Sequence, residues 1–247
     1  MLLIPESLFE PADQLAMDEA LLVWAEEQTD RSYEFLRLWE FAGPTVVLGR
    51  SSRVDEEIDV PYCESHSIPI FRRCSGGASI VGGPGCLMYS VVLDLNLRPE
   101  LSQINACHDF VMQRLTMAMQ KHAPEIAFQG ICDLTIGNRK FSGNSMRMIR
   151  RHVLYHGTIL YSADLELIAK CLRTAPRQPE YRSGRDHDSF ITNINVDAKR
   201  IESEIQRSFA VNAKRDSAKE TILLQISERS QLLKQERYEK REWNFLR

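Results

Sequence analysis

The sequence lacks several patterns that identify common classes of protein. No apolar run reaches the roughly 18–20 residues that a membrane-spanning helix needs. The six cysteines form no Cys-x-x-Cys pair, and no set of histidines and cysteines has the spacing of a zinc site. A formal net charge of −3 gives the chain no general attraction to nucleic acid or to anionic membrane. The first ten residues lack the basic and long apolar segments of a signal peptide, so we expect a cytoplasmic protein with neither nucleic acid nor membrane as partner.

The sequence has the composition of a globular protein with more than one kind of secondary structure. Its 247 residues suffice for one domain of about 180–220 residues and an appendage. Apolar periodicity predicts helices over 12–28, 102–122 and 164–173, with Asp18 and Glu19 exposed in the first. Strands are predicted over 33–39, 45–48, 68–72, 87–95 and 152–161, and a hairpin over 133–148. This pattern favours an α+β fold with a mixed or antiparallel sheet flanked by helices over residues 1–195, followed by a helical C-terminal extension over 196–247.

A glycine-rich stretch over 71–83 is the first candidate for a binding site. Adjacent glycines, Gly76 and Gly77, let the backbone bend tightly and present N–H groups to an anion. Arg72 and Arg73 precede them and could neutralise a phosphate or a carboxylate. No Gly-Lys-Ser/Thr follows, so this is not a Walker A loop, and taken alone such a stretch is more often a simple turn.

Two further stretches contain residues that could take part in chemistry. Lys140 follows the predicted turn at 137–139, where its ammonium could reach an anion, although a surface lysine is the more common outcome. Asp133 could hold Mg²⁺, which uses one or two carboxylates together with phosphate oxygens. In the strand over 152–161, His156 could be a general base, and Gly157 would let a ligand or a neighbouring backbone approach closely.

In this order and spacing, the three stretches resemble the biotin/lipoate protein ligase superfamily, and most closely its lipoate–protein ligase A branch. That family has Arg-Arg-x-Ser-Gly-Gly, then Asp-Leu before a Lys-x-Ser-Gly hairpin, then His-Gly-Thr on the next strand. The matching segments here are 72–77, 133–134, 140–143 and 156–158. The resemblance covers roughly residues 8–195 and implies the catalytic fold of biotin ligases and class II aminoacyl-tRNA synthetases.

The resemblance implies an enzyme that activates lipoate or octanoate with ATP and Mg²⁺ and transfers the acyl group to a carrier lysine. The implied catalytic residues are Lys140 and Asp133, with Asp133 also near the metal. The implied nucleotide contacts are Arg73, Gly76, Gly77, Ala78, Ser79, Ile80, Val81 and Lys140. The implied contacts of the acyl substrate are Arg72, His156, Gly157 and Thr158. A fixed cation suits this reaction, because adenylation brings a carboxylate and a phosphate together.

The implied partner is an apo lipoyl carrier domain, either a 2-oxoacid dehydrogenase subunit or a glycine-cleavage H protein. Large family members continue beyond the position of Arg247 into an accessory domain, so a separate accessory subunit is a further possible partner. The polar loop over 181–187, with Arg182 and Arg185, is expected to be a solvated connection. Alternatively, it guides an acidic carrier or covers the pocket.

Some residues depart from the family pattern. Ala78 replaces a third glycine, and Gly82-Gly83 replaces a His-Asp pair. One alternative is therefore an octanoyl or lipoyl transferase of the same superfamily, which takes its acyl group from a thioester through a cysteine nucleophile. Cys132 is the best candidate for that nucleophile, ahead of Cys171 and Cys74. A second alternative is a non-catalytic protein that binds an acyl ligand or a carrier domain.

Overall fold

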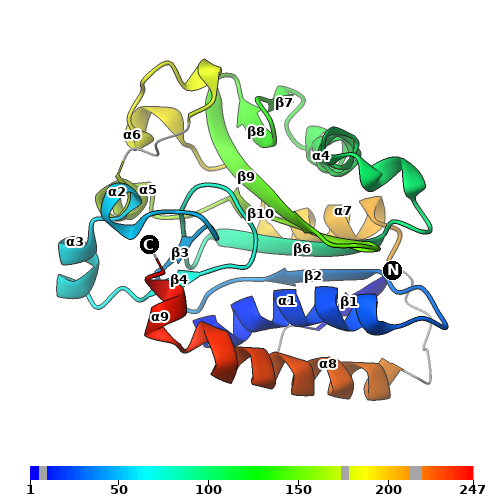
Figure 1. Ribbon diagram of the computed structural model, residues 1–247. Coiled ribbons are helices and arrows are strands. Elements are labelled where there is room, and N and C mark those ends of the chain that lie inside the picture. Colours follow the sequence, from blue (N-terminus) through cyan, green and yellow to red (C-terminus); the bar gives the residue numbers. More distant parts are fainter. Residues whose placement is uncertain (6–9, 174–177, 212–218, 247) are drawn as a thin grey trace.

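A mixed seven-stranded sheet forms the centre of the molecule (Figure 1). The computed structural model describes residues 1–5, 10–173, 178–211 and 219–246. The strands lie in the order β1 (Leu2–Ile4), β2 (Phe35–Trp39), β6 (Cys86–Asp94), β10 (His152–Leu160), β9 (Arg139–Met148), β8 (Asp133–Ile136) and β7 (Ile126–Gln129). Only β1 and β2 pair in parallel, and every other pair in this sheet is antiparallel. The predicted α+β class with a mixed sheet is therefore confirmed.

A second, three-stranded sheet holds the two ends of the glycine-rich stretch. Its order is β4 (Ile70–Arg72), β3 (Thr45–Leu48) and β5 (Ile80–Gly82). β4 pairs with β3 in parallel, and β5 pairs with the other edge of β3 in the antiparallel sense. The sequence did not predict β5. Because both flanking strands pair with the same strand, the loop between them has fixed ends.

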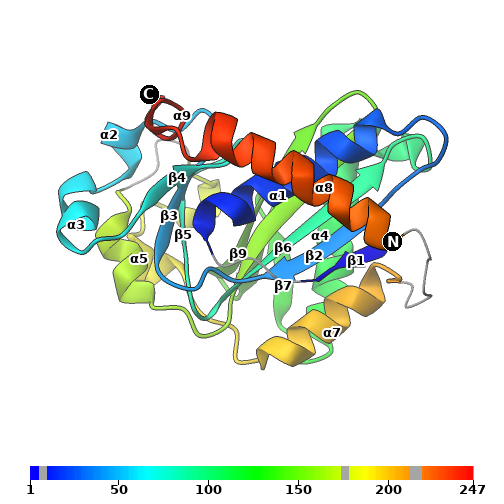
Figure 2. The same ribbon diagram turned by 90° about the horizontal axis from the view of Figure 1, so that it is seen from below.

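Helices cover both faces of the large sheet (Figures 1 and 2). α1 (Pro11–Glu27) and α8 (Lys219–Leu233) pack together on one face, whereas α4 (Ile104–Gln120) and α7 (Ala198–Ser208) pack together on the other. The shorter helices are α2 (Val54–Glu57), α3 (Val60–Ser65), α5 (Leu165–Cys171), α6 (His187–Phe190) and α9 (Arg241–Asn244). Single turns occupy Pro99–Ser102 and Glu180–Arg182, and a π-helical turn, Lys234–Tyr238, follows α8. Within the described part of the chain, no helix has both the length and the apolarity needed to cross a bilayer.

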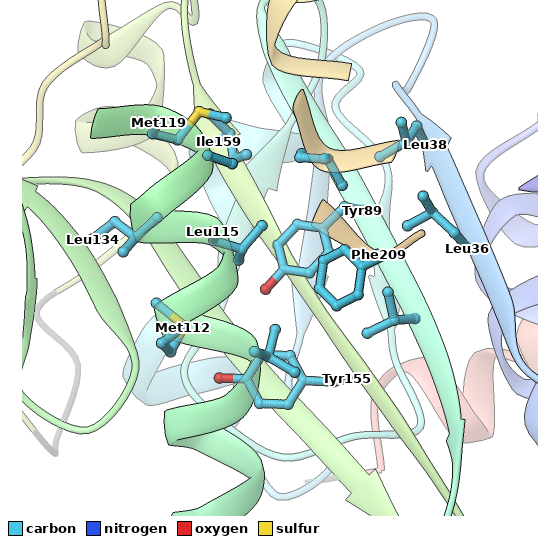
Figure 3. Packing of buried hydrophobic residues seen from close by; sticks show 14 of the residues in the cluster. Leu36, Leu38, Tyr89, Met112, Leu115, Met119, Leu134, Tyr155, Ile159 and Phe209 are labelled. Atoms are coloured by element: carbon cyan, nitrogen blue, oxygen red, sulfur yellow. The ribbon is translucent and has the colours of Figure 1, made fainter. Parts of the chain in front are cut away.

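The main core lies between the sheet and the pair α4 and α7 (Figure 3). Alternate residues of β6, including Tyr89 and Val91, point into this core, because successive side chains of a strand face opposite sides of the sheet. Met112 and Leu115 from α4 pack against them, and Phe209 closes the cluster from the end of α7. α7 therefore buries part of the main core. The predicted division at 195/196 stays a prediction, and 212–218 and 247 within the predicted extension lie outside the described residues.

The prediction that Asp18 and Glu19 are exposed on the first helix is wrong. Both residues are only 2% exposed. α1 lies between the sheet on one side and α8 with the π-helical turn on the other, so it has no solvent-facing side at these positions. Asp18 forms a salt bridge with Arg37 at 2.9 Å, and Glu19 binds Arg147, Arg237 and Tyr238. These partners come from distant segments, so helical periodicity alone could not predict the burial.

Candidate active site

Two adjoining cavities lie between the small sheet and the β9–β10 part of the large one. Each has a volume of about 110 Å³. Both are lined by Ala78, Ser79, Ile80, Lys140, Gly143 and Thr158. The structure thus brings the glycine-rich loop, the lysine hairpin and the His-Gly-Thr strand together, although they are far apart in the sequence.

The glycine-rich loop forms a wall that the two cavities share. Gly77 has a φ of +83°, which favours glycine, and its carbonyl oxygen lies so close to Gly49 that a Cβ there would meet it at 1.9 Å. Gly77 lines the second cavity and Val81 the first, while Gly76 lines neither. Instead, the Gly76 carbonyl accepts hydrogen bonds from Arg73 and from Ser145.

Arg73 shapes this loop from the inside. Its guanidinium donates to the carbonyl oxygens of Val47, Gly76 and Ala78 and to Ser75 Oγ. Burial lowers the pKa of Arg73 to about 10, so the group keeps its charge at neutral pH. Arg73 also lines the second cavity. The second cavity therefore has a positive charge in its wall, but hydrogen bonds to backbone oxygens already hold the Arg73 guanidinium in place.

Glu57 fixes the other end of the loop. Its Oε2 accepts hydrogen bonds from the backbone nitrogen of Ser79 at 2.9 Å and from Ser79 Oγ at 2.7 Å. Glu57 is 7% exposed and lines the first cavity. No motif in the sequence indicated this residue, because the contact spans 22 positions.

Lys140 lies at the junction of the two cavities. Its Nζ is 2.7 Å from Asp133 Oδ1, and its side chain is 28% exposed. Gly143 leaves space for this side chain, since a Cβ at that position would lie 2.7 Å from Lys140 Nζ. Asp133 also accepts a hydrogen bond from Tyr181 Oη at 2.8 Å. The predicted hairpin is confirmed, with Gly137 at a φ of +57° in its turn.

His156 belongs to a buried chain of hydrogen bonds beside the second cavity. One ring nitrogen lies 3.0 Å from Asp18 Oδ2, and the other is within hydrogen-bonding distance of Ser75 Oγ. Burial raises the pKa of Asp18, but the hydrogen bond with His156 and the charge of Arg37 outweigh this effect and hold the pKa below its ordinary value. His156, Gly157 and Thr158 all line the second cavity. His156 thus lines a cavity with both of its ring nitrogens in use, and its role in binding a substrate stays a prediction.

The comparisons with known proteins agree with this arrangement. A family model described as the lipoyl protein ligase A/B catalytic domain matches residues 10–210. The chain belongs to this family. The matched region contains the glycine-rich loop, the lysine hairpin and the His-Gly-Thr strand, which line the cavities. It also includes α7.

Relatives of two kinds match the chain. Lipoate–protein ligase 1 of Staphylococcus aureus is 25% identical over 76% of this chain and 54% of its own length. This chain therefore spans about half the length of that ligase. Octanoyltransferase LipM of Oceanobacillus iheyensis is 26% identical over 81% of this chain and 80% of its own length.

Solved structures of lipoate–protein ligases have the same fold. A bipartite lipoate–protein ligase of Thermoplasma acidophilum, described with its E2 lipoyl domain, has a TM-score of 0.80 and 19% identity, covering 99% of this chain and 95% of that one. A lipoate–protein ligase A bound with ATP has a TM-score of 0.76 and 18% identity, covering 99% of this chain and 98% of that one. At these identities the likeness shows the fold alone.

Several of the positions that drew attention in the sequence, Asp133 among them, do not line the cavities. Arg72 is fully buried, and its guanidinium donates to backbone oxygens of Gly49, Ser52 and Trp243. It does not line either cavity, so the structure does not bring it together with the other predicted substrate contacts. The unusual segment at 82–85 forms the turn from β5 to β6, where Gly85 has a φ of +85°. It likewise lines neither cavity.

The candidate cysteine nucleophiles are poorly placed to ionise. Burial, followed by the charge of Asp133, raises the pKa of Cys132 to about 11. The pKa of Cys74 and that of Cys171 are each raised to about 12, first of all by burial. A nucleophilic cysteine needs the thiolate, and these three remain thiols at neutral pH. Cys132 Sγ donates to the Asn144 carbonyl and lines neither cavity.

The polar loop after residue 177 forms a wall of the first cavity. Arg182 is 4% exposed and lines this cavity together with His187 and Phe190. The expectation of a solvated connection is therefore wrong for Arg182, whereas the alternative of a loop that covers the pocket agrees with the structure. Sequence spacing gave no sign of this role, because the loop reaches the cavity only by folding back over the lysine hairpin.

Proposed function

We propose that the protein is an ATP-dependent lipoate– or octanoate–protein ligase. It would adenylate the acid and then transfer the acyl group to a lysine of a lipoyl carrier domain. One observation is the basis of this proposal: the ammonium of Lys140 lies where the two cavities meet. A carboxylate in one cavity and an α-phosphate in the other would meet at that ammonium.

The walls of the cavities suit these two substrates. The second cavity has apolar walls from Leu15, Trp39, Val47 and Met88, which fit an aliphatic tail. Its polar side, with His156, would face the carboxyl end. The first cavity is also mostly apolar, with Ile168, Leu172 and Phe190 among its walls, but it contains Arg173 and Arg182, and these cations suit a triphosphate.

Adenylation would take place at the junction. A carboxylate oxygen attacks the α-phosphorus, an acyl–phosphate bond forms, and the bond to the β-phosphate breaks to release pyrophosphate. Lys140 would leave Asp133 for the approaching anions and offset their repulsion, which stabilises the transition state. Asp133 would then be free to orient the neutral amine of the carrier lysine. That amine attacks the acyl carbon and displaces AMP, and positioning supplies much of the rate of this step.

Mg²⁺ would bind together with ATP, at its phosphates. Among the described residues, no group of three or more His, Cys, Asp or Glu is placed to hold a metal ion. Asp133 binds Lys140 and Tyr181, and Glu57 binds Ser79. Both oxygens of Asp133 are in use, so it would give Mg²⁺ a ligand only after Lys140 has moved to the substrate. The ion would take its other ligands from phosphate and water. Such an ion would neutralise part of the triphosphate charge.

The proposed partner is a lipoyl domain of a 2-oxoacid dehydrogenase or a glycine-cleavage H protein. The bipartite Thermoplasma ligase, whose structure was described with its E2 lipoyl domain, supports a carrier of this kind. Its two-part organisation also supports an accessory subunit as a second partner.

Octanoyl transfer without ATP is the second candidate function. In its favour, LipM of Oceanobacillus iheyensis aligns over 80% of its own length, a larger share than the 54% of the Staphylococcus ligase. Against it stand the raised pKa values of Cys74, Cys132 and Cys171, because a thioester intermediate needs an ionised thiol.

The test is the mass of an apo lipoyl domain after incubation with the enzyme. We expect octanoyl or lipoyl addition from the free acid only when ATP and Mg²⁺ are present. Lys140→Met should reduce the rate at least about a hundredfold, since it removes a charge that acts in the transition state. Lys121→Met, which removes an ammonium paired with Glu204 on the surface, should leave the rate unchanged.

Cysteine variants separate the two candidate functions. Cys132→Ser and Cys171→Ser should retain ATP-dependent transfer. Acylation from an octanoyl carrier thioester without ATP, abolished by one of these substitutions, would replace the ligase proposal with the transferase.

A further inference from the structure

Arg182 is a buried cation that forms no salt bridge with an acidic side chain of the described residues. Its Nε donates to the Arg185 carbonyl at 2.7 Å, and its guanidinium lies over the ring of Phe190 at 4.7 Å. Nη2 is buried and has no hydrogen-bond partner among the described residues. Within the same ranges, no Asp or Glu lies within salt-bridge distance of Arg182, although the residue is only 4% exposed. Burial lowers the pKa of Arg182, and the charge of Asp186 acts to raise it.

A buried guanidinium in this state is unusual. Buried polar groups nearly always have a hydrogen-bond partner, and buried charges are usually paired. Aromatic stacking offsets part of the cost of burying the charge but leaves the N–H groups of Nη2 unused. Arg182 lines the first cavity, so a rotation of its guanidinium would let an anion bound there pair with the charge.

The other groups around the first cavity favour an anion as well. Lys140, Arg173 and Arg182 line it, against a single carboxylate, Glu57, which already accepts two hydrogen bonds from Ser79. His187 lines it too, and burial followed by the charge of Arg182 lowers the pKa of His187 to about 4. The imidazole is therefore neutral at neutral pH. Because Asp133 pairs with Lys140, the positive charge of the cavity comes mainly from Arg173 and Arg182.

We infer that Arg182 binds a phosphate group in the first cavity, and specifically the β- or γ-phosphate of ATP. A guanidinium fits two phosphate oxygens with parallel N–H groups, a geometry that a point charge does not offer. Lys140 lines both cavities and is placed for the reacting α-phosphate, whereas Arg182 lines only the first and is placed for the part that leaves as pyrophosphate. This inference rests on the proposed function. The phosphates of a coenzyme A thioester are the other source of the same chemical group.

Arg185 provides a matched control. It belongs to the same loop, and its guanidinium lies over the same Phe190 ring at 5.3 Å. Its donors, however, are all directed to backbone oxygens, including those of Asn138 and Tyr181, and it does not line the first cavity. Arg185→Gln therefore removes the same charge and a similar ring contact without removing a cavity donor.

The experiment measures binding to the full chain by calorimetry. The ligands are ATP, its non-hydrolysable α,β-methylene analogue, octanoate and octanoyl coenzyme A. Arg182→Gln should weaken the binding of ATP and its analogue at least about tenfold, which is the loss expected for one charge-assisted hydrogen bond. Its affinity for octanoate should stay within about twofold of the wild type. Arg182→Lys should bind ATP with intermediate affinity, and Arg185→Gln should bind it like the wild type.

The outcomes distinguish this inference from the proposed function. Wild-type affinity for ATP in Arg182→Gln would overturn the inference and leave the ligase proposal standing. Equal loss of ATP and octanoate binding, with a lower unfolding temperature than Arg185→Gln, would make Arg182 a structural residue and also overturn the inference. If the wild type binds octanoyl coenzyme A but not ATP, and Arg182→Gln loses that binding, Arg182 is confirmed as a phosphate ligand and the ligase proposal fails.

Discussion

The ammonium of Lys140 pairs with Asp133 at 2.7 Å and is only partly shielded from solvent. Partly exposed ion pairs contribute little to stability, so this pair can open at a small cost in free energy. Tyr181 holds the second oxygen of Asp133, which keeps the carboxylate in place when Lys140 moves. The pair therefore suits a lysine whose ammonium moves from Asp133 to a bound anion during the reaction.

Among the glycines that line the second cavity, Gly157 has the least space for a side chain. A Cβ there would lie 1.8 Å from Asn144 Oδ1 and 2.8 Å from the Gly143 carbonyl. We expect Gly157→Ala to lower the free energy of unfolding by about 1–3 kcal/mol through overpacking. It should also weaken octanoate binding, because Gly157 lines the second cavity. Urea unfolding and calorimetry measure the two effects.

Gly184→Ala is the control for this substitution. Nothing lies within 4 Å of a Cβ at that position, although its φ of +72° adds backbone strain. Octanoate affinity should therefore stay at the wild-type value in Gly184→Ala. An unchanged octanoate affinity in Gly157→Ala would mean that this strand does not contact the acid.

Among the elements, α9 supports the glycine-rich loop from behind. Arg72 donates to the Trp243 carbonyl at 3.0 Å, and Trp243 Nε1 donates back to the Arg72 carbonyl at 2.9 Å. Asn244 Oδ1 accepts from the Arg72 backbone nitrogen at 2.9 Å. Through its bonds to Gly49 and Ser52, Arg72 then links α9 to the turn that packs against Gly77.

Trp243→Phe tests this support. It keeps an aromatic ring but removes the buried hydrogen bond from the indole nitrogen to the Arg72 carbonyl, so the free energy of unfolding should fall by about 1–3 kcal/mol. The KM for ATP should rise as well, because the loop that lines both cavities loses part of its support. Leu246→Ala, at a side chain that is 53% exposed, is the control. A lower stability with an unchanged KM would show that α9 supports the fold and not the site.

For the whole molecule, the two cavities should behave as one site. Ligands that bind only the folded state stabilise it, by about 2.7 kcal/mol at a hundred times Kd. We expect α,β-methylene-ATP and octanoate each to raise the unfolding temperature, and the two together to raise it by at least the sum of both shifts. In Lys140→Met the combined shift should fall below that sum, because the carboxylate and the phosphate would meet without the cation. Thermal unfolding with each ligand alone and with both measures this coupling.

Local patterns in the sequence were enough to predict most of the elements and to identify the motifs. Alternating and helical periodicity placed β6, β10, α1 and α4 to within a few residues, and Gly137 marked the turn of the lysine hairpin. These features depend on residues that are neighbours in the chain, which is why they are visible without a structure. The resemblance to the family rested on the same short segments, and the family model confirmed it.

The burial of charged residues and the identity of their partners became visible only in the folded protein. Asp18, Glu19 and Arg72 look like surface residues or ligand contacts in the sequence, but each is buried against partners from distant segments. β5 was missed because its three residues are too few to show an alternating pattern, and only the pairing with β3 identifies them as a strand. The meeting of the two cavities at Lys140 is likewise a product of long-range packing, since burial and electrostatics depend on distance in space and not along the chain.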